Sequence, residues 1–261
     1  MIKVTIWNEY RQERLGTAEC PIPEHWGEEA KVWLPKAIEQ IKEVHRGGAI
    51  HDTLRGIAEE NEEVQVVHIA NLDMPECGLT EEVLNDTDVL IWWSHIAQDE
   101  VPYEVALRVR DHVWKGMGII FLHSAHMSRP MQLLLGSSCT LRWEHDYAAH
   151  IRCCNPNHPI ARGVDGDIFL ETEEMYGEYF DIPTPDELIF ITGFDKGEVF
   201  RSGCLWNRGY GKVFYFQPGH ETNYAYWNPQ VRKVIQNAIS YLVRREGKLE
   251  KVECTAVHTK E

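Results

Sequence analysis

Three short segments of this 261-residue chain are apolar almost throughout, and they limit the folds open to it. The segments are Asp88–Trp93, Met117–Leu122 and Lys212–Phe216. A strand with one face in water alternates polar and apolar residues, whereas an unbroken apolar run is typical of a strand covered on both faces. Such strands belong to parallel sheets with helices on either side. The chain is therefore expected to contain a buried parallel sheet.

Helical patterns alternate with these runs. Pro102 stands where a helix is expected to begin, a position that tolerates proline. An apolar stripe recurs every four residues from the residue before it, at Val101, Val105, Val109 and Val113. Asn228 and Pro229 are expected to cap a last helix, whose apolar face is Val231, Val234, Ile235, Ala238, Ile239 and Leu242. This alternation predicts an α/β fold of the flavodoxin-like class, with a mostly parallel sheet and helices on both faces.

The remaining elements are less regular. Ile2–Trp7 and Val64–Ala70 are expected to be strands, and a helix is expected over Lys36–Glu60 with a break at Gly47-Gly48. Between residues 140 and 205 the alternation weakens, and only two short strands are predicted there, Ala149–Cys154 and Glu187–Thr192. No boundary is evident, so one domain is expected over residues 1–245, followed by a polar tail over 246–261.

The charge balance limits the partners of the chain. It carries 41 acidic and 26 basic residues, for a formal net charge of −15. A surface this acidic repels phosphate and anionic lipid, so neither nucleic acid nor a membrane is an expected partner. The sequence lacks a membrane-spanning apolar run and a secretory signal, and its seven cysteines include no C-x-x-C pair. A reduced, cytoplasmic protein is expected, and the sequence leaves open whether it forms a homo-oligomer.

Three histidines follow the apolar runs. His95 lies two residues beyond the first run, His123 directly follows the second, and His220 lies four residues beyond the third. Ligands of open α/β sheets bind outside the carboxyl ends of the strands. We therefore expect the three imidazoles to converge on one site.

The segment around His123 has the layout of a nucleophile elbow, in which a sharp turn between strand and helix projects one side chain. The projecting residue would be His123, where a hydrolase has serine or cysteine. Imidazole is a metal ligand or a general base rather than a stable acylation centre. A serine hydrolase that uses Ser124 is a weaker alternative, because no G-x-S-x-G pattern surrounds this residue.

An acidic segment, Glu171–Glu178, is expected to supply the carboxylate of the site. Glu174 and Tyr176 are two residues apart, so an extended chain points both side chains to one side. A sugar ring would offer a flat face to aromatic side chains, and the expected contacts are Trp92, Trp93, Tyr176 and Trp227. Second-rank candidates for the site are His126, His145 and Asp146.

Several of these segments together resemble the ThuA-like (trehalose utilisation) family. They are Lys115–Ala125, Glu173–Glu178 and Gly209–His220, with the shorter stretches Trp92–His95 and His158–Ile160. The resemblance spans about Met1 to Val243, nearly everything except the tail. It implies a fold similar to class I glutamine amidotransferase domains. His123 stands in place of their cysteine nucleophile, so glutaminase chemistry is not expected.

The resemblance also implies a role in the catabolism of trehalose and related disaccharides, acting on a 3-keto derivative of the sugar. We expect a carbohydrate-processing enzyme with a divalent metal, zinc or manganese, because mixed histidine and carboxylate ligands suit these ions. The expected ligands are His95, His123, Glu174 and His220, and the expected catalytic residues are His123, Glu174 and His220. The reaction could be an isomerisation, an elimination or a hydrolysis. A non-catalytic sugar-binding or regulatory protein on a degenerate amidotransferase scaffold remains the alternative.

Overall fold

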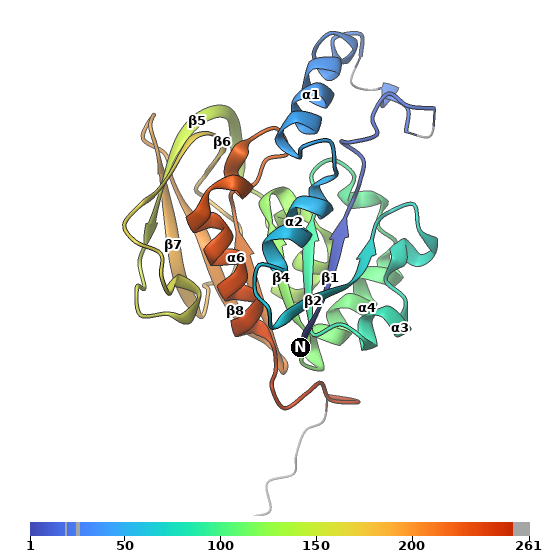
Figure 1. Ribbon diagram of the computed structural model, residues 1–261, viewed down its shortest axis with the longest axis vertical. Coiled ribbons are helices and arrows are strands. Elements are labelled where there is room, and N and C mark those ends of the chain that lie inside the picture. The colour runs from blue at the N-terminus through green and yellow to red at the C-terminus, as the bar shows by residue number, and fades with distance from the viewer. Residues whose placement is uncertain (19, 25–26, 253–261) are drawn as a thin grey trace, which may run out of the picture.

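Nine strands form one sheet in the computed structural model, which describes residues 1–18, 20–24 and 27–252 (Figure 1). The strand order is β2-β1-β3-β4-β9-β8-β7-β5-β6. The first five strands in this order pair in parallel. They are β1 (Ile2–Asn8), β2 (Val64–Ala70), β3 (Val89–Trp93), β4 (Gly118–Leu122) and β9 (Gly211–Phe216). The predicted strands of the parallel half are therefore present.

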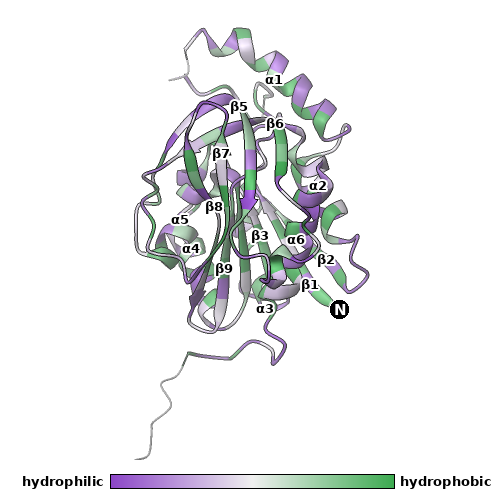
Figure 2. Ribbon diagram, turned by 90° about the vertical axis from the view of Figure 1, so that its left-hand side faces the viewer, coloured by the Kyte–Doolittle hydropathy of each residue, from purple (hydrophilic) through white to green (hydrophobic). Residues whose placement is uncertain are grey.

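Helices cover both faces of this half, as its apolar strands require. Every residue of β3 and β4 is buried. Figure 2 shows α2 (Ile50–Ala58) and α6 (Pro229–Leu242) on one side of the sheet, with α4 (Tyr103–Trp114) and α5 (Arg129–Leu135) on the other. The short helix α3 (Glu81–Asn85) packs beside α4. The predicted valine stripe is buried, with its first residue, Val101, just before α4 and the other three within it, and the predicted apolar face of α6 is buried as well.

The residues at the helix ends explain where the helices begin and end. Asn228 accepts hydrogen bonds from the first free N–H groups of α6, and Pro229 occupies the first helical position. The helix predicted over Lys36–Glu60 consists of two helices, α1 (Ala30–Val44) and α2. They are separated at Gly47, whose φ of +81° suits glycine. Single 3-10 turns lie at Gln98–Glu100, His123–Met127, Pro159–Ala161 and Tyr224–Trp227, and the turn at Pro75–Gly78 has left-handed residues at Glu76 and Cys77.

The prediction of a mostly parallel sheet is wrong, because the sheet is mixed. Four of its eight neighbouring strand pairs are antiparallel. They involve β5 (Arg142–Cys153), β6 (Ile168–Gly177), β7 (Glu187–Phe194), β8 (Val199–Arg208) and β9. Residues 195–198 join β7 to β8, and residues 209–210 join β8 to β9. Connections this short can join only antiparallel neighbours. The two short predicted strands lie largely within β5 and β7, while β6 and β8 were not predicted.

The carboxyl ends of the parallel strands lie at the end of the molecule where α1 projects (Figure 1). An arm formed by the described residues between β1 and α1 packs against α1 through a small apolar cluster of its own, built on Leu15, Cys20 and Leu34. This cluster is separate from the main core. The arm and α1 therefore form a distinct layer above the ends of the strands.

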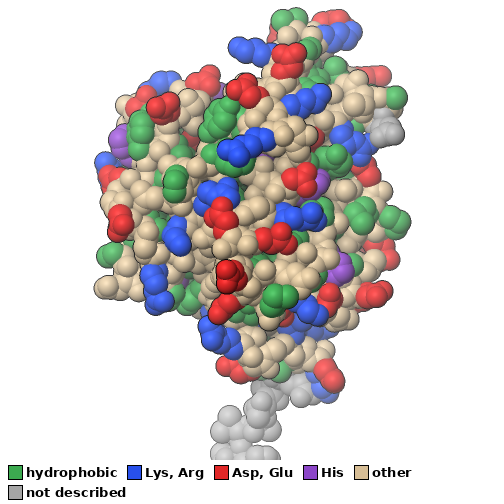
Figure 3. Space-filling model, in the orientation of Figure 1, with side chains coloured by type: hydrophobic (Ala, Val, Ile, Leu, Met, Phe, Trp, Pro, Cys, Tyr) green, Lys and Arg blue, Asp and Glu red, His purple; other side chains and the backbone are tan. Residues whose placement is uncertain are grey.

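Acidic and basic side chains are interspersed over the described part of the face seen in Figure 3. None of the helices within the described ranges is both long enough and apolar enough to cross a membrane. The predicted polar tail, residues 246–261, extends past Val252, the last residue that the structure describes.

Candidate metal centre

The register of the parallel strands aligns the ends that precede the three histidines. Trp93 of β3 pairs with Leu122 of β4, and Leu122 pairs with Phe216 of β9. These three residues are the last of their strands, so the chain leaves the sheet at neighbouring points of one edge. Whatever side chains follow are brought close together by strand pairing alone.

The three imidazole rings form a triangle. The ring centroids are 5.1 Å apart for His95 and His123, 5.1 Å for His95 and His220, and 5.3 Å for His123 and His220. One ligand atom from each ring and one carboxylate oxygen of Glu221 all lie within 4.8 Å of one another. The structure therefore brings together the three histidines that the sequence pointed to, and the cluster could hold a metal ion.

Two of the rings have their Nδ1 atom in contact with the loop that carries His220. His95 Nδ1 lies 2.9 Å from Glu221 Oε2, and His220 Nδ1 lies 2.9 Å from the hydroxyl oxygen of Thr222. A partner on Nδ1 fixes the orientation of an imidazole and leaves Nε2 for a ligand. His95 is thus held in the way that metal-binding histidines usually are, whereas His220 Nδ1 also accepts a hydrogen bond of 3.3 Å from the backbone N–H of Thr222.

His123 directly follows β4 and is the first residue of the 3-10 turn His123–Met127. Its φ is +54°, a left-handed conformation that is uncommon outside glycine and asparagine. The predicted elbow geometry is therefore present, with an imidazole at the projecting position. His123 Nδ1 lies 3.3 Å from the backbone oxygen of Gln217, to which it can donate a hydrogen bond. This bond also leaves Nε2 of the ring for a ligand.

Glu174 and Tyr176 meet His123 from the neighbouring part of the sheet. Glu174 Oε2 lies 3.2 Å from His123 Nε2, and the Tyr176 hydroxyl oxygen lies 3.4 Å from the same nitrogen. Both residues belong to β6, so the two-residue spacing places them on one side of an extended segment, as expected. The Tyr176 hydroxyl also shares a hydrogen bond with the Ser124 hydroxyl.

The charges of the site depend on one another. Burial opposes ionisation of Glu221, but His220 and His95 outweigh it and hold the pKa of this carboxyl well below its usual range. Burial likewise opposes ionisation of Glu174, and His123 nevertheless lowers the pKa of Glu174 to about 2. Burial disfavours protonation of His95, yet Glu221 raises its pKa to about 9. Both carboxylates are therefore ionised at neutral pH.

Two buried glutamates fasten the loops that carry His95 and His220. Glu9 accepts hydrogen bonds, at 2.8 and 3.1 Å, from the two backbone N–H groups that follow His95. Glu173 accepts hydrogen bonds at 3.0 and 3.3 Å from two successive N–H groups, the second being that of His220. Burial raises the pKa of both carboxyls, although these N–H groups counteract it. Glu9 and Glu173 are thus positioning residues that act on the backbone beside the imidazoles.

His126 lies beside the triangle and makes a hydrogen bond of 2.7 Å between its Nδ1 and the backbone oxygen of Cys139. Burial lowers the pKa of His126 to about 4. In the unfolded chain this imidazole titrates at its ordinary value of about 6.5. Protonation therefore favours the unfolded state between these two values, and stability is lost as the pH falls from about 6.5 to about 4.

We predict that His126→Asn removes much of this loss, because an asparagine amide can still donate to the Cys139 oxygen but does not titrate. Between pH 7 and pH 4, the free energy of unfolding of wild type should fall by roughly 3 kcal/mol more than that of the variant. Urea unfolding of both proteins at a series of pH values measures it. Parallel pH profiles would show that His126 does not contribute.

A cavity of about 810 Å³ opens above the histidines, within the size range of small-molecule sites. Its wall on the sheet side includes the site residues His95, Glu174, Tyr176, His220 and Glu221. The second-rank candidates His126, His145 and Asp146 also line it. His145 Nδ1 is 3.6 Å from Glu174 Oε1. His123 is fully buried behind this wall. The arm and α1 form the opposite wall.

Three of the predicted aromatic contacts are not brought into the cavity. Trp92 and Trp93 are fully buried. The ring of Trp92 stacks on Trp7, and that of Trp93 lies beneath His123 with its N–H donating to a backbone oxygen. Trp227 lies outside the cavity lining and stacks under the guanidinium of Arg46. Trp92 and Trp93 thus form the support of the site, since strands covered on both faces direct their side chains into the core.

Sequence reasoning missed three carboxylates. Glu221 directly follows His220, and Glu9 directly follows the last residue of β1. The rule that pointed to the histidines, a polar residue just beyond a strand, would have found both. Glu173 lies next to Glu174 in the acidic segment that was expected to supply the carboxylate of the site, and only its burial in β6 reveals its role.

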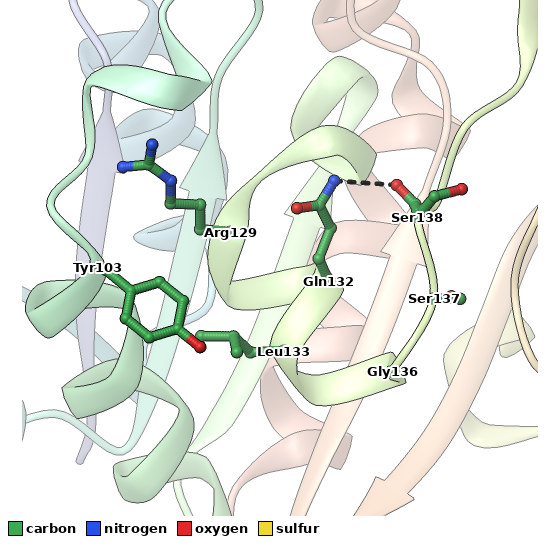
Figure 4. A pocket seen from close by; sticks show the side chains of 7 residues that line it. All are labelled: Tyr103, Arg129, Gln132, Leu133, Gly136, Ser137 and Ser138. Carbon is green, nitrogen blue, oxygen red and sulfur yellow. Dashed lines mark hydrogen bonds between the residues drawn. The ribbon is translucent and has the colours of Figure 1, made fainter.

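A second hollow, of about 520 Å³, lies beside α5 (Figure 4). Tyr103, Arg129, Gln132 and Leu133 line it together with residues 136–138, and Gln132 donates a hydrogen bond of 2.9 Å to the backbone oxygen of Ser138. Its lining includes neither histidine nor carboxylate among the described residues. The histidine cluster is therefore the better candidate for chemistry.

Solved structures with the same fold include three that are informative. A putative ThuA-like protein from Parabacteroides merdae matches with a TM-score of 0.62 and 12% identity, covering 96% of each chain. A cytoplasmic protein from Salmonella typhimurium matches 74% of this chain and 87% of its own, with a TM-score of 0.53 and 13% identity. PurLQS from Thermotoga maritima matches 92% of this chain and 99% of its own, with a TM-score of 0.51 and 14% identity. No curated protein matches the sequence.

The fold is thus that of the class I glutamine amidotransferase-like proteins, with His123 at the elbow. Within this class, a family model described as ThuA, trehalose utilisation, matches residues 27–242. The chain belongs to the ThuA family, and the resemblance noted in the sequence is confirmed.

Proposed function

We propose that the protein is a cytoplasmic enzyme of carbohydrate catabolism that acts on a disaccharide or its 3-keto derivative with the help of a divalent metal. The observation that carries the proposal is the triangle of His95, His123 and His220, with carboxylates beside it and a cavity above it. Membership of the trehalose utilisation family supports a sugar substrate.

The donor set fits zinc or manganese. Three imidazoles would supply neutral nitrogen ligands, and an oxygen of Glu174 or Glu221 would complete the set. Glu221 is the carboxylate that lies within reach of all three imidazoles, whereas Glu174 contacts His123 and is the alternative ligand. A bound divalent ion would polarise a carbonyl oxygen of the sugar or activate water.

The side chains around the cluster supply the rest of the chemistry. Glu174 is ionised at neutral pH and lines the cavity, so it could accept a proton from the acidic C–H beside the carbonyl of a keto-sugar. Tyr176 lies beside it, and its hydroxyl could donate a hydrogen bond to a sugar oxygen. His123 holds Glu174 in place from behind the cavity wall.

The proposal is tested by incubating protein purified without an affinity tag with 3-keto-trehalose and following product formation by chromatography. We expect turnover that is lost after treatment with EDTA and restored by zinc or manganese. The opposite outcome is saturable quenching of tryptophan fluorescence by trehalose or its keto derivative without formation of product. That result would favour the non-catalytic sugar-binding protein. Labelling by a fluorophosphonate would point to a hydrolase that uses Ser124.

A further inference from the structure

The cavity has a second half, remote from the histidines, that the proposed chemistry does not use. The arm and α1 form it, through Gln12, Leu15, Trp33, Leu34, Gln40 and Ile41. Leu15, Leu34 and Ile41 are buried and give this half an apolar base. Trp33 is half exposed, at 49%. The lining thus combines an aromatic ring, aliphatic surface and two carboxamides.

This half is held at a set distance from the candidate metal centre. The Gln40 amide donates a hydrogen bond of 2.9 Å to the backbone oxygen of Thr222. A ring nitrogen of His45, the residue at the end of α1, lies 3.1 Å from the backbone oxygen of Glu221. The helix is therefore tied to the loop that carries His220. A ligand that spans the cavity would meet both halves in a defined arrangement.

Gln12 is the unusual residue of this lining. Its side chain is only 3% exposed, yet neither its amide nitrogen nor its amide oxygen has a hydrogen-bond partner among the described residues. An unpaired buried amide is costly, and such groups in native proteins usually have a partner in water or a ligand. A carboxamide both donates and accepts, and a sugar hydroxyl does the same. The cavity that Gln12 lines is where such a partner can enter.

Trp33 supplies the complementary surface. The face of an indole ring packs against the apolar C–H face of a sugar, while amides bind the hydroxyls at its edge. Carboxylates gather on the opposite wall, at Glu174 and Glu221, whereas the lining contributed by α1 includes a single charged residue, Lys36. A neutral polyhydroxylated ring suits this half better than a phosphate or an acyl chain.

We propose that Gln12 and Trp33 form a distal subsite that binds the sugar ring farther from the histidines, and so selects a disaccharide over a monosaccharide. This inference rests on the proposed function, because it places the second ring of the disaccharide in the half of the cavity that contains the histidines. The arm and α1 would then determine whether the protein binds a disaccharide or a monosaccharide.

The test is calorimetric titration of the full chain with trehalose and, separately, with glucose. Wild type is expected to bind trehalose at least tenfold more tightly than glucose. Trp33→Ala and Gln12→Leu are each expected to weaken trehalose binding about tenfold and to leave glucose binding unchanged. Val32→Ala serves as the matched control, because Val32 neighbours Trp33 on α1 but is 81% exposed and does not line the cavity.

A second readout separates ligand recognition from a structural role. Gln12→Leu replaces an unpaired buried amide with a side chain of similar size, so its melting temperature without sugar should be equal to or higher than that of wild type. A lower melting temperature, unchanged trehalose affinity in either variant, or equal affinity of wild type for both sugars would overturn the subsite. Absence of trehalose binding by wild type would overturn it as well.

These outcomes are independent of the chemistry at the histidines. Neither sugar is turned over in a binding titration, and the metal content can be measured on the same samples. Protein that lacks metal or turnover but shows the expected affinity differences would refute the proposed function and retain the distal subsite.

Discussion

Replacing His123 with asparagine is expected to remove bound zinc or manganese from the protein. The variant loses an imidazole from one corner of the triangle but keeps the backbone, because asparagine tolerates the left-handed φ of +54° found there. Even changes outside the ligand shell typically weaken metal binding 10–100-fold, so loss of a ligand should cost more than about 100-fold. Plasma mass spectrometry of protein purified without an affinity tag measures the metal content directly.

Two further variants sharpen this result. His220→Gln should lose metal to a similar extent, since His220 occupies another corner of the triangle. His68→Gln should retain it, because His68 lies on β2 and pairs with Asp86 away from the cavity. Circular dichroism at 25 °C checks that all three fold. Equal and negligible metal in wild type and variants would remove the metal from the proposed function.

Glu174→Gln is expected to reduce turnover of 3-keto-trehalose by a factor of about 10² to 10⁴, the usual contribution of a general base. The amide has nearly the shape of the carboxylate and can still contact His123, but it cannot accept a proton. Initial rates measured over a range of substrate concentrations give kcat and KM. The metal content of the same preparation shows whether a lost ligand or a lost base is responsible.

A control for Glu174→Gln is a second glutamate on the same strand. Glu171 belongs to β6 and is exposed, so Glu171→Gln removes the same charge without touching the cavity. Its kcat should be close to that of wild type. A rate for Glu174→Gln within about twofold of wild type would refute the role of Glu174 as base and leave it, at most, a ligand.

The parallel half of the fold was predictable because its evidence is local. An unbroken run such as Val89–Trp93 can be stable only where both faces are covered, whatever the rest of the chain does. The antiparallel half was not predictable to the same degree. Residues of β6 such as Glu171 and Glu173 are acidic, and their place in a strand depends on pairing with β5. Such pairing joins distant segments and leaves a weak signal in a single sequence.

The candidate site divides in the same way. The sequence by itself determined that His95, His123 and His220 would meet, because each follows a buried strand and parallel strands end at one edge. Only the tertiary structure decided which groups surround them. It placed Glu221 against His95, buried Trp92 and Trp93 beneath the site, and set Gln12 and α1 across the cavity. These contacts depend on how loops fold over the sheet, and loop paths are fixed by packing between segments far apart in the chain rather than by local pattern.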